Sequence, residues 1–473
     1  MSFSPFVRPR GSALPALAVL VAATVGGLMP LARPGALTVG FVALVLLPIT
    51  ALVFAGPARA ATITAALAYV AALAWAYPSY MVPTYAYEGL IDAAPAPAAL
   101  LIVAALAALP VVWLPLSARR PSSIVLWTLW VAGYVPAIVV SLYLEGDLET
   151  VLAFDVALLG SMAIVVLMTR LRPAAILAPH LSLTAFTRLL LGLGLLCSVY
   201  IAATFGLRLS LPALADVYET RDEFAIALGG GAAGGGYVVF WAGNVINPMM
   251  TALGMARKRI DLVTLGVLGQ LLIYSVTGFK STLFSVALVP LVYVIIVGAR
   301  RSFGVVATLA AAVVLVASVS PSFGSPVSLG LATRTFATTG QVSWAYYDYF
   351  STHPPYNLSH SFLSWLVDSP YHEEPPSVIG AVYFDNASAN ASYWADAFAN
   401  FGFAGILGFT LVLGLVLWIA DGLGQQRDAR VAGPMLAIAG LNLASGALFT
   451  TILTGGLALG CALMALMPPA SDG

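Results

Sequence analysis

Apolar residues form long stretches along almost the whole chain, separated by short polar segments. A helix needs about 20 mostly apolar residues to cross the hydrocarbon layer of a bilayer, and the stretches are close to that length. The pattern therefore predicts an all-α polytopic membrane protein with about fourteen transmembrane helices. We expect these helices over residues 12–31, 36–56, 60–77, 97–117, 123–144, 149–169, 184–206, 237–256, 260–278, 281–299, 303–320, 396–420, 431–449 and 452–467.

The composition agrees with a membrane protein. Hydrophobic residues make up 60% of the chain and charged residues only 8%, whereas a soluble domain has about 25% charged residues. The formal net charge is zero, so the overall charge indicates no class of partner. We expect the bilayer and no nucleic acid among the partners. Cys197 and Cys461 both lie in apolar stretches, which is typical of small core residues and not of a disulfide framework or a metal site.

Lysine and arginine residues in short loops indicate the orientation, because cytoplasmic loops are enriched in them. If the N-terminus is cytoplasmic, most of the 20 basic residues fall on the cytoplasmic side and both termini face the cytoplasm. The exceptions, on the outer side, are Arg33, Arg208, Arg221, Lys280 and Arg334. All except Arg33 lie in residues 207–473, so the outer face of that part of the chain is the candidate functional region.

Two long outer loops suggest a division of the chain into two parts. We expect an N-terminal bundle of about seven helices over residues 1–206. The C-terminal half, residues 207–473, carries the outer loops 207–236 and 321–395. Long loops of this kind are often functional.

The second long loop is unusually aromatic, and it contains His353, His360 and His372. A segment this rich in Trp and Tyr can bury enough surface to fold, so we expect short helices at the membrane interface. Aromatic faces such as those of Tyr346 and Tyr347 can stack on sugar rings. Interfacial anchoring alone is an equally good explanation for any single one of them.

Lys280 begins a predicted membrane helix in the segment "SVTGFKSTLF". A lysine is unfavourable beside the positive end of a helix dipole, and a charge at membrane depth costs a further ~2.5–3.5 kcal/mol. Lys280, Ser281 and the helix N-terminus could together bind an anion such as a phosphate or diphosphate. The plainer alternative is an ion pair between Lys280 and an outer carboxylate, such as Asp155 or Glu219.

Arg221 and Arg334 are candidates for binding the same anion. Arg221 lies in the mixed-charge segment "DVYETRDEF", where a solvated loop is the simpler explanation, and Arg334 is the only basic residue of the second long loop. Arginine binds phosphate oxygens through two parallel hydrogen bonds. With Lys280, two arginines could hold a diphosphate and stabilise it as a leaving group.

A lipid-linked diphosphate sugar fits this arrangement, and its transfer needs a base for the acceptor hydroxyl. No metal-ligand spacing occurs in the sequence, so we expect a metal-independent reaction without a cofactor. The predicted catalytic groups are Arg221, Lys280, Arg334, Asp348 and His360. The predicted substrate contacts are Arg208, Glu219, Asp222, Ser281, Tyr346, Tyr347 and His372, and Glu219, Asp222 and His372 are also candidate bases.

Three further polar residues lie within predicted membrane helices. Asp155 is expected one or two turns from the outer end of its helix, where an ionisable side chain is either functional or paired with Lys280 or Arg208. Asn244 and Asn247, in "GNVINPMM", either line a cavity or form hydrogen bonds between helices, and the proline predicts a distortion of that helix.

The order of these motifs resembles that of bacterial Wzy-type oligosaccharide repeat-unit polymerases, the O-antigen polymerase family. The resemblance rests on "VYETRDEF", "YVVFWAGNVINPMM", "GFKSTLF", "RTFATTGQVSWAYYDYF" and "NFGFAGILGFTLVLGL". It covers residues 207–420, and Arg221, Lys280 and Arg334 match the family's functional basic residues by position. Some members have a glycine eleven residues after the arginine, where this chain has Ala232 and Ala345.

The resemblance implies a glycosyltransferase in the plasma membrane whose active site faces outward. Such enzymes join oligosaccharide repeat units carried on undecaprenyl diphosphate, which serve as both donor and acceptor, and they can work with a chain-length regulator protein. Two alternatives stay open. One is an O-antigen ligase, which uses the same donor, and the other is a flippase for lipid-linked oligosaccharides, for which polar groups at the bilayer midplane would be expected.

Overall fold

The computed structural model describes residues 58–173, 176, 178–206, 211–212, 217–229, 233–298, 302–320, 329–361 and 364–470. The predicted spans 12–31 and 36–56 lie outside these residues. The described chain is helical, apart from loops and one isolated β-bridge between Arg427 and Pro469.

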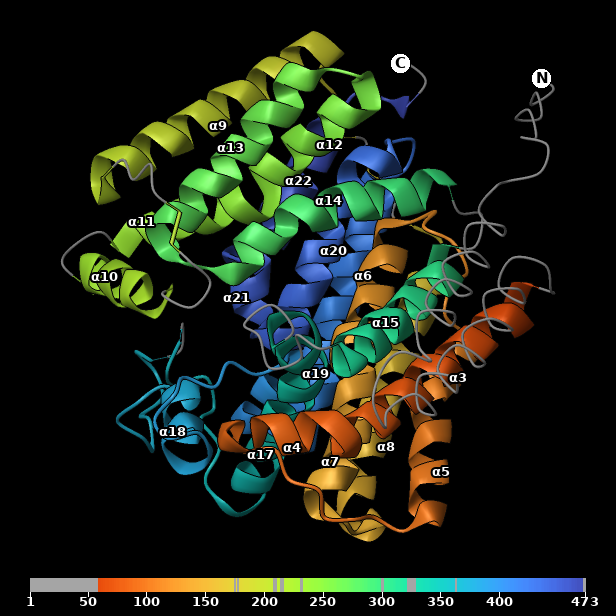
Figure 1. Ribbon diagram of the computed structural model, residues 1–473. Helices are drawn as coiled ribbons and strands as arrows, with labels where there is room; N and C mark the ends of the chain where they lie inside the picture. Colours follow the sequence, from red (N-terminus) through yellow and green to blue (C-terminus); the bar gives the residue numbers. More distant parts are fainter. Residues whose placement is uncertain are drawn as a thin grey trace.

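The helices follow one another along the chain as separate elements and as longer continuous runs (Figure 1). Up to the first long outer loop they are α3 (Ala58–Ala76), η2 (Tyr77–Met81), α4 (Val82–Tyr85), η3 (Ala86–Glu88), α5 (Pro97–Ala108), η4 (Leu109–Val112), α6 (Pro121–Leu129), η5 (Trp130–Tyr134), α7 (Val135–Glu145), α8 (Leu148–Arg170) and α9 (Leu183–Phe205). The remaining helices are α10 (Val217–Gly229), α11 (Ala233–Trp241), η6 (Ala242–Ile246), α12 (Asn247–Arg257), α13 (Ile260–Thr277), α14 (Lys280–Gly298), α15 (Ser302–Val319), η7 (Leu329–Ala337), α17 (Thr338–Thr352), α18 (Pro375–Tyr383), α19 (Tyr393–Leu423), α20 (Ala429–Ser445), α21 (Leu448–Leu453) and α22 (Leu457–Leu466).

Several helical runs are long and apolar enough to cross a membrane, so the chain is a multi-pass helical membrane protein. In the described part of the chain they are Arg59–Glu88, Pro121–Glu145, Leu148–Arg170, Leu183–Phe205, Gly235–Arg257, Ile260–Thr277, Lys280–Gly298, Tyr393–Leu423 and Leu448–Leu466. Three predicted spans correspond to shorter helices, which are Pro97–Val112, Phe303–Val319 and α20. The count of fourteen spans therefore stays a prediction.

Two of the prolines inside the membrane helices lie just after wider π-helical turns. The turn η5 comes just before Pro136, and η6 comes just before Pro248. Proline has no N–H to donate and its ring clashes with the carbonyl four residues earlier, and a π turn gives that carbonyl room to move. The distortion predicted at "GNVINPMM" therefore takes the form of a π turn.

The first described helical run is longer than the predicted span 60–77. It continues through the π turn η2, which contains Pro78, and ends at Glu88. The extension makes residues 78–88, which follow the predicted span, helical as well. As a result, Glu88 is carried to the neighbourhood of Arg334.

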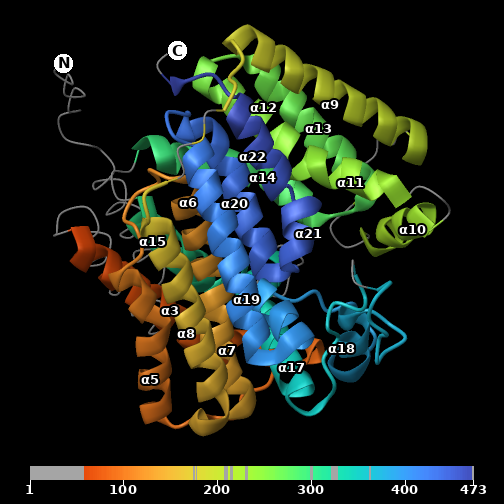
Figure 2. The same cartoon turned by 180° about the vertical axis from the view of Figure 1, so that it is seen from behind.

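Helices from the two predicted halves pack against each other. The helix α15 lies along α3, α19 along α8 and α20 along α6, and they share one large hydrophobic core. A second, smaller core joins α9, α10, α11 and α13 through residues such as Phe224, Val239 and Ile273. Figures 1 and 2 both show α9 to α13 as a group on one side of the molecule. Helices from before and after residue 206 therefore share both hydrophobic cores.

The second long loop contains the short helices that its composition predicts, but one of them is not interfacial. The helix α17 packs against α7 and α19, and its residues Gly340–Tyr346 are buried. A Cβ atom at Gly340 would lie 2.2 Å from the carbonyl oxygen of Pro136, so only glycine permits this approach. The expectation of a surface position is therefore wrong for α17.

The last predicted span, residues 452–467, is interrupted. The helices α21 and α22 are separated at Gly455 and Gly456, and Gly456 has φ +96°. The sequence pattern does not reveal this break, because glycines are frequent in transmembrane helices. Helix α19 is also kinked, at Phe401 and Gly402, inside the stretch that predicts a single span.

Candidate functional site

Three basic residues from distant parts of the sequence lie close together in the structure. Arg221 belongs to α10, Lys280 begins α14, and Arg334 lies in η7. Lys280 is within electrostatic range of both arginines and of Glu88. These four side chains, which we name the basic cluster, have a net charge of about +2 when all are ionised.

The turn between α13 and α14 positions Arg221. The Arg221 Nε donates a hydrogen bond of 3.4 Å to the carbonyl oxygen of Gly278, and its guanidinium carbon lies 5.8 Å from the Phe279 ring centroid. Gly278 has φ +62°, and a Cβ atom there would lie 2.7 Å from the Val217 carbonyl oxygen. Glycine therefore lets α10 pack directly on the turn that carries Lys280.

Lys280 is held at the start of α14 by the residues before it. Thr277 Oγ1 accepts a hydrogen bond of 3.2 Å from the Phe279 backbone N–H. The Phe279 ring stacks on Phe240, with ring centroids 5.8 Å apart. Lys280 is half-buried and Ser281 is exposed. An anion near Ser281 would therefore meet the lysine ammonium at the positive end of a helix.

Arg334 forms an ion pair with Glu88. Its Nη2 atom lies 2.9 Å from Glu88 Oε1 and 2.7 Å from Glu88 Oε2. Gln341 Nε2 donates to the Glu88 carbonyl oxygen at 3.0 Å, which fixes the end of η3 against α17. The Arg334 side chain is 45% exposed and that of Glu88 only 19%. The guanidinium thus keeps an open side on which an anion could bind.

Sequence reasoning misses Glu88. It lies 246 residues before Arg334 and carries no local motif. The available signal is the ordinary expectation that an outer arginine has a carboxylate partner. Glu88 is one of two acidic residues between the predicted spans 60–77 and 97–117.

The predicted site residues of the second long loop have different environments. Asp348 is exposed and accepts a hydrogen bond of 2.6 Å from the Tyr383 hydroxyl. Tyr347 is half-buried and stacks on Phe154, with ring centroids 4.8 Å apart. Tyr346 is only 1% exposed, and its hydroxyl donates to Ala389. Its ring is enclosed by the bundle, so the prediction that Tyr346 contacts a sugar does not fit the structure.

The rest of the loop is held together by aromatic contacts. Tyr349 stacks on His353 with centroids 3.9 Å apart, and Tyr356 stacks on Tyr371 at 4.5 Å. His360 packs edge-on against Tyr356. The composition thus predicts a folded loop correctly, and many of the aromatic faces are used for packing within the loop.

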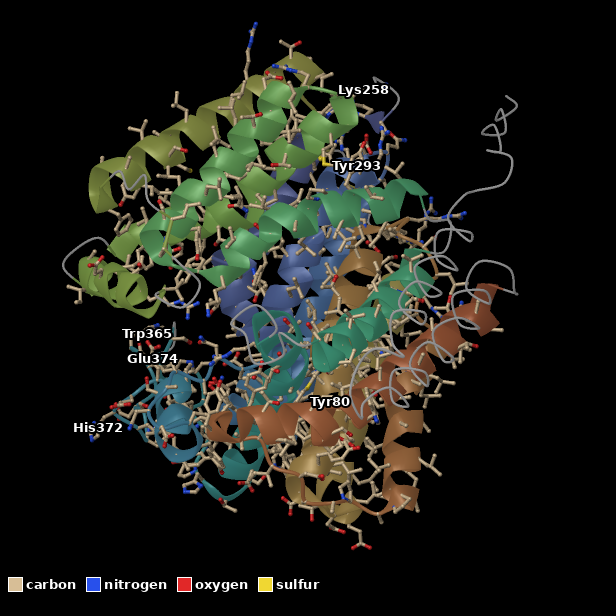
Figure 3. The ribbon with its side chains drawn as sticks, viewed as in Figure 1. Tyr80, Lys258, Tyr293, Trp365, His372 and Glu374 are labelled. Atoms are coloured by element: carbon tan, nitrogen blue, oxygen red, sulfur yellow. The ribbon has the colours of Figure 1, made fainter. Side chains whose placement is uncertain are left out.

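His372 and Trp365 are exposed on the surface of the loop (Figure 3). The exposed fraction of Trp365, 79%, is large for an aromatic side chain. Sequence reasoning does not single out Trp365, because nothing in the local pattern distinguishes it from the other aromatic residues of the loop. Its exposed face makes it a better candidate than Tyr346 for contact with a sugar.

Acidification should destabilise the protein through His360. Burial lowers the pKa of His360, and nearby Glu374 offsets part of this effect. The folded state therefore favours the neutral ring, so its contribution to stability is full above the unfolded pKa of about 6.5 and decreases as the pH falls. Between pH 7.5 and 5.5, the thermal midpoint of the wild type should fall more than that of His360→Gln. Equal shifts would contradict this role of His360.

Asp155 is fully buried in α8, near Ser141 and Tyr134. Among the residues that the structure describes, no lysine or arginine forms an ion pair with it. The alternative of pairing with Lys280 is therefore not supported. The other suggested partner, Arg208, lies outside the described residues.

The remaining predicted residues of the first long loop are seen only in part. Glu219 and Asp222 belong to α10, but their side chains are not among those described.

Within the described residues, no group of three or more His, Cys, Asp or Glu side chains could hold a metal ion. Cys197 and Cys461 are both free thiols.

No protein-family model, curated protein or solved structure matches this chain.

Proposed function

We propose that this protein is a membrane glycosyltransferase that polymerises oligosaccharide repeat units carried on undecaprenyl diphosphate. The observation that carries this proposal is the basic cluster. Arg221, Lys280 and Arg334 are drawn from three separate segments, and they gather at the end of a membrane helix. The carboxylate of Glu88 lies beside them, within electrostatic range of Lys280 and paired with Arg334. A diphosphate has the charge and the oxygen atoms that such a group can bind.

The proposed reaction transfers the growing chain from its carrier to the next unit. The bond between the anomeric carbon and the donor diphosphate breaks, and a bond from that carbon to an acceptor hydroxyl forms. The electron pair of the broken bond stays on the diphosphate, where the basic cluster stabilises the negative charge. The acceptor proton passes to a base, for which exposed Asp348 and half-buried His360 are candidates beside Glu219, Asp222 and His372.

Contacts at the opposite end of the bundle support the proposed orientation. Arg59 donates to the Leu114 carbonyl oxygen at 2.6 Å, and Arg170 donates to that of Trp113 at 2.8 Å. Basic residues thus gather there at the ends of several helices, as expected of a cytoplasmic face. The basic cluster would then lie at the outer face of the plasma membrane, where the lipid-linked units are joined.

The decisive experiment compares lipid-linked glycans from cells that carry the matching repeat-unit pathway. Cells without the protein and cells with Lys280→Asn should accumulate single repeat units outside the plasma membrane. For Lys280→Asn, polymer formation should fall about 10²-fold, the typical effect of removing one group that stabilises the developing charge. Glycans are resolved by size after the outer and inner pools are separated.

Lys258→Asn is the matched control. Lys258 is exposed at the turn between α12 and α13, and its φ of +54° is one that asparagine tolerates. This variant should polymerise normally. Accumulation of single units on the cytoplasmic side would instead indicate a flippase, whereas polymer that forms but is not passed to its final acceptor would indicate a ligase.

A further inference from the structure

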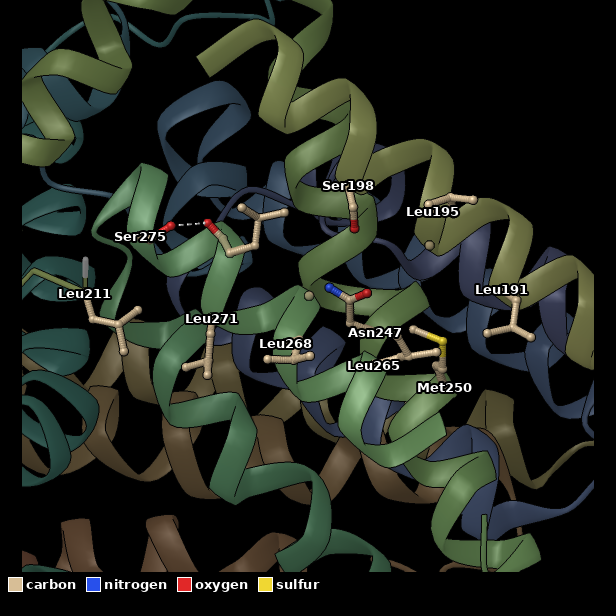
Figure 4. A pocket seen from close by; sticks show the side chains of 13 residues that line it. Leu191, Leu195, Ser198, Leu211, Asn247, Met250, Leu265, Leu268, Leu271 and Ser275 are labelled. Carbon is tan, nitrogen blue, oxygen red and sulfur yellow. Dashed lines mark hydrogen bonds between the residues drawn. The ribbon is translucent and has the colours of Figure 1, made fainter. Parts of the chain in front are cut away.

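We propose that a groove between α9 and α13 binds the part of the lipid carrier's hydrocarbon chain that is nearest to the diphosphate. This inference rests on the proposed function. It adds a binding site for the lipid chain to the proposed binding site for the diphosphate. The groove, named here the α9–α13 groove, has a volume of about 650 Å³ (Figure 4). Its lining residues include Gly194, Leu195, Asn247, Met250, Leu268 and Ser275.

The walls of the groove are suited to hydrocarbon. Leu195 of α9 is 67% exposed and Leu268 of α13 is 55% exposed, although both helices belong to the apolar, membrane-spanning set. Such side chains face lipid when the protein is in a bilayer. The groove therefore opens sideways to the membrane, so that a lipid chain could enter without crossing an aqueous phase.

The floor of the groove is closed by residues from α12. Asn247 and Met250 are buried, and Figure 4 shows both between the leucines of α9 and those of α13. A Cβ atom at Gly269 would lie 2.7 Å from the Asn247 side chain. The sequence predicts that Asn247 either lines a cavity or forms a hydrogen bond between helices. In the structure its side chain lines the groove and also lies against Gly269 of α13. The residues at the floor of the groove are thus tightly packed, whereas the leucines of its walls are exposed.

The groove leads towards the basic cluster. It follows α13 from Leu265 to Ser275, about 15 Å along the helix axis. The five residues from Ser275 to Lys280 can span no more than about 17 Å. The carbonyl of Gly278, between these two residues, accepts the hydrogen bond from Arg221. A lipid with its chain in the groove would therefore place its head group near Arg221 and Lys280.

The charge of the cluster favours a lipid diphosphate over an ordinary phospholipid. The three cations of the basic cluster complement a diphosphate better than a single phosphate ester that carries one negative charge. The volume of the groove suffices for a few isoprene units and not for a whole long chain. The rest of the chain would remain in the bilayer.

The test measures binding to the purified full-length protein in nanodiscs, with undecaprenyl diphosphate and inorganic diphosphate as probes. Wild-type protein should bind the lipid at least tenfold more tightly than the inorganic ion. Leu195→Trp fills the groove and should reduce this preference to about twofold or less, with unchanged affinity for inorganic diphosphate. Leu196→Trp is the matched control, because Leu196 is also 67% exposed but does not line the groove.

The outcomes separate this inference from the proposed function. If Leu195→Trp keeps the full preference for the lipid, and Leu268→Trp does too, the groove is not the chain site, while the proposed function is unaffected. If phosphatidylglycerol competes as well as undecaprenyl diphosphate, the groove is a general lipid site and the inference is overturned. If the wild type binds the lipid through the groove but cells show no polymerisation defect without the protein, the proposed function fails alone. Should Leu195→Trp not fold, Leu268→Trp decides.

Discussion

Replacement of Arg334 by alanine should lower polymer formation by about 10²-fold or more, whereas Glu88→Gln should change it only a few-fold. Removing one donor that stabilises a developing negative charge typically costs 10²–10³-fold in rate. Arg334 is 45% exposed while paired with Glu88, so its guanidinium can also meet a substrate oxygen. The measurement is the rate at which purified variants extend a defined lipid-linked repeat unit.

The pair of variants separates a role in the reaction from a role in folding. Both substitutions break the ion pair between η3 and η7, but only Arg334→Ala removes the cation. Exposed ion pairs contribute only about 0–1 kcal/mol to stability, so both proteins should unfold at nearly the same temperature. Equal losses of activity in the two variants would show that Arg334 acts through the ion pair and not on the substrate. Arg334→Lys should recover only part of the activity, since lysine lacks the planar fork.

A membrane-impermeant amine reagent should modify Lys280 and leave Lys258 unmodified in intact spheroplasts. These are the two lysines of the chain, which makes them unusually clean reporters. The proposed orientation places Lys280 at the outer face and Lys258 in the cytoplasm, and Figure 3 shows Lys258 far from His372 and Trp365 of the second long loop. Peptide mass spectrometry reads the extent of modification at each site, with an expected difference of tenfold or more.

Permeabilised spheroplasts provide the control, because both lysines should then react. Undecaprenyl diphosphate should protect Lys280 and have no effect on Lys258, which lies outside the basic cluster. Modification of Lys258 but not Lys280 in intact spheroplasts would invert the topology and remove the outward-facing site. If Lys280 reacts fully and the lipid does not protect it, the diphosphate does not bind at the start of α14.

Much of the helical architecture could be predicted from the sequence, because the length of an apolar stretch is a local property. The predicted span 149–169 closely matches α8, and 260–278 closely matches α13. Other boundaries shifted where backbone geometry intervened. A π turn extends the first described run to Glu88, and Gly456 interrupts the last one.

The candidate site was predictable only in part. Lys280, Arg221 and Arg334 stand out because few basic residues fall on the predicted outer side, and this signal can be counted along the chain. Their mutual proximity depends on how α10 packs on the turn at Gly278 and on how η7 is held beside η3. Tyr346 shows the opposite case, because its sequence context is that of an exposed loop and its actual environment is the core.

The sequence by itself determined that the chain is a helical membrane protein, which residues form most of its helices, and which cations are unusual in position. Hydrophobicity and charge are properties of individual residues, so their pattern along the chain can be analysed without knowledge of the fold. Only the tertiary structure decided that Glu88 pairs with Arg334, that α17 is buried, and that a groove lies between α9 and α13. These features arise from contacts between segments far apart in the chain, and such contacts are set by packing between helices and leave no local pattern.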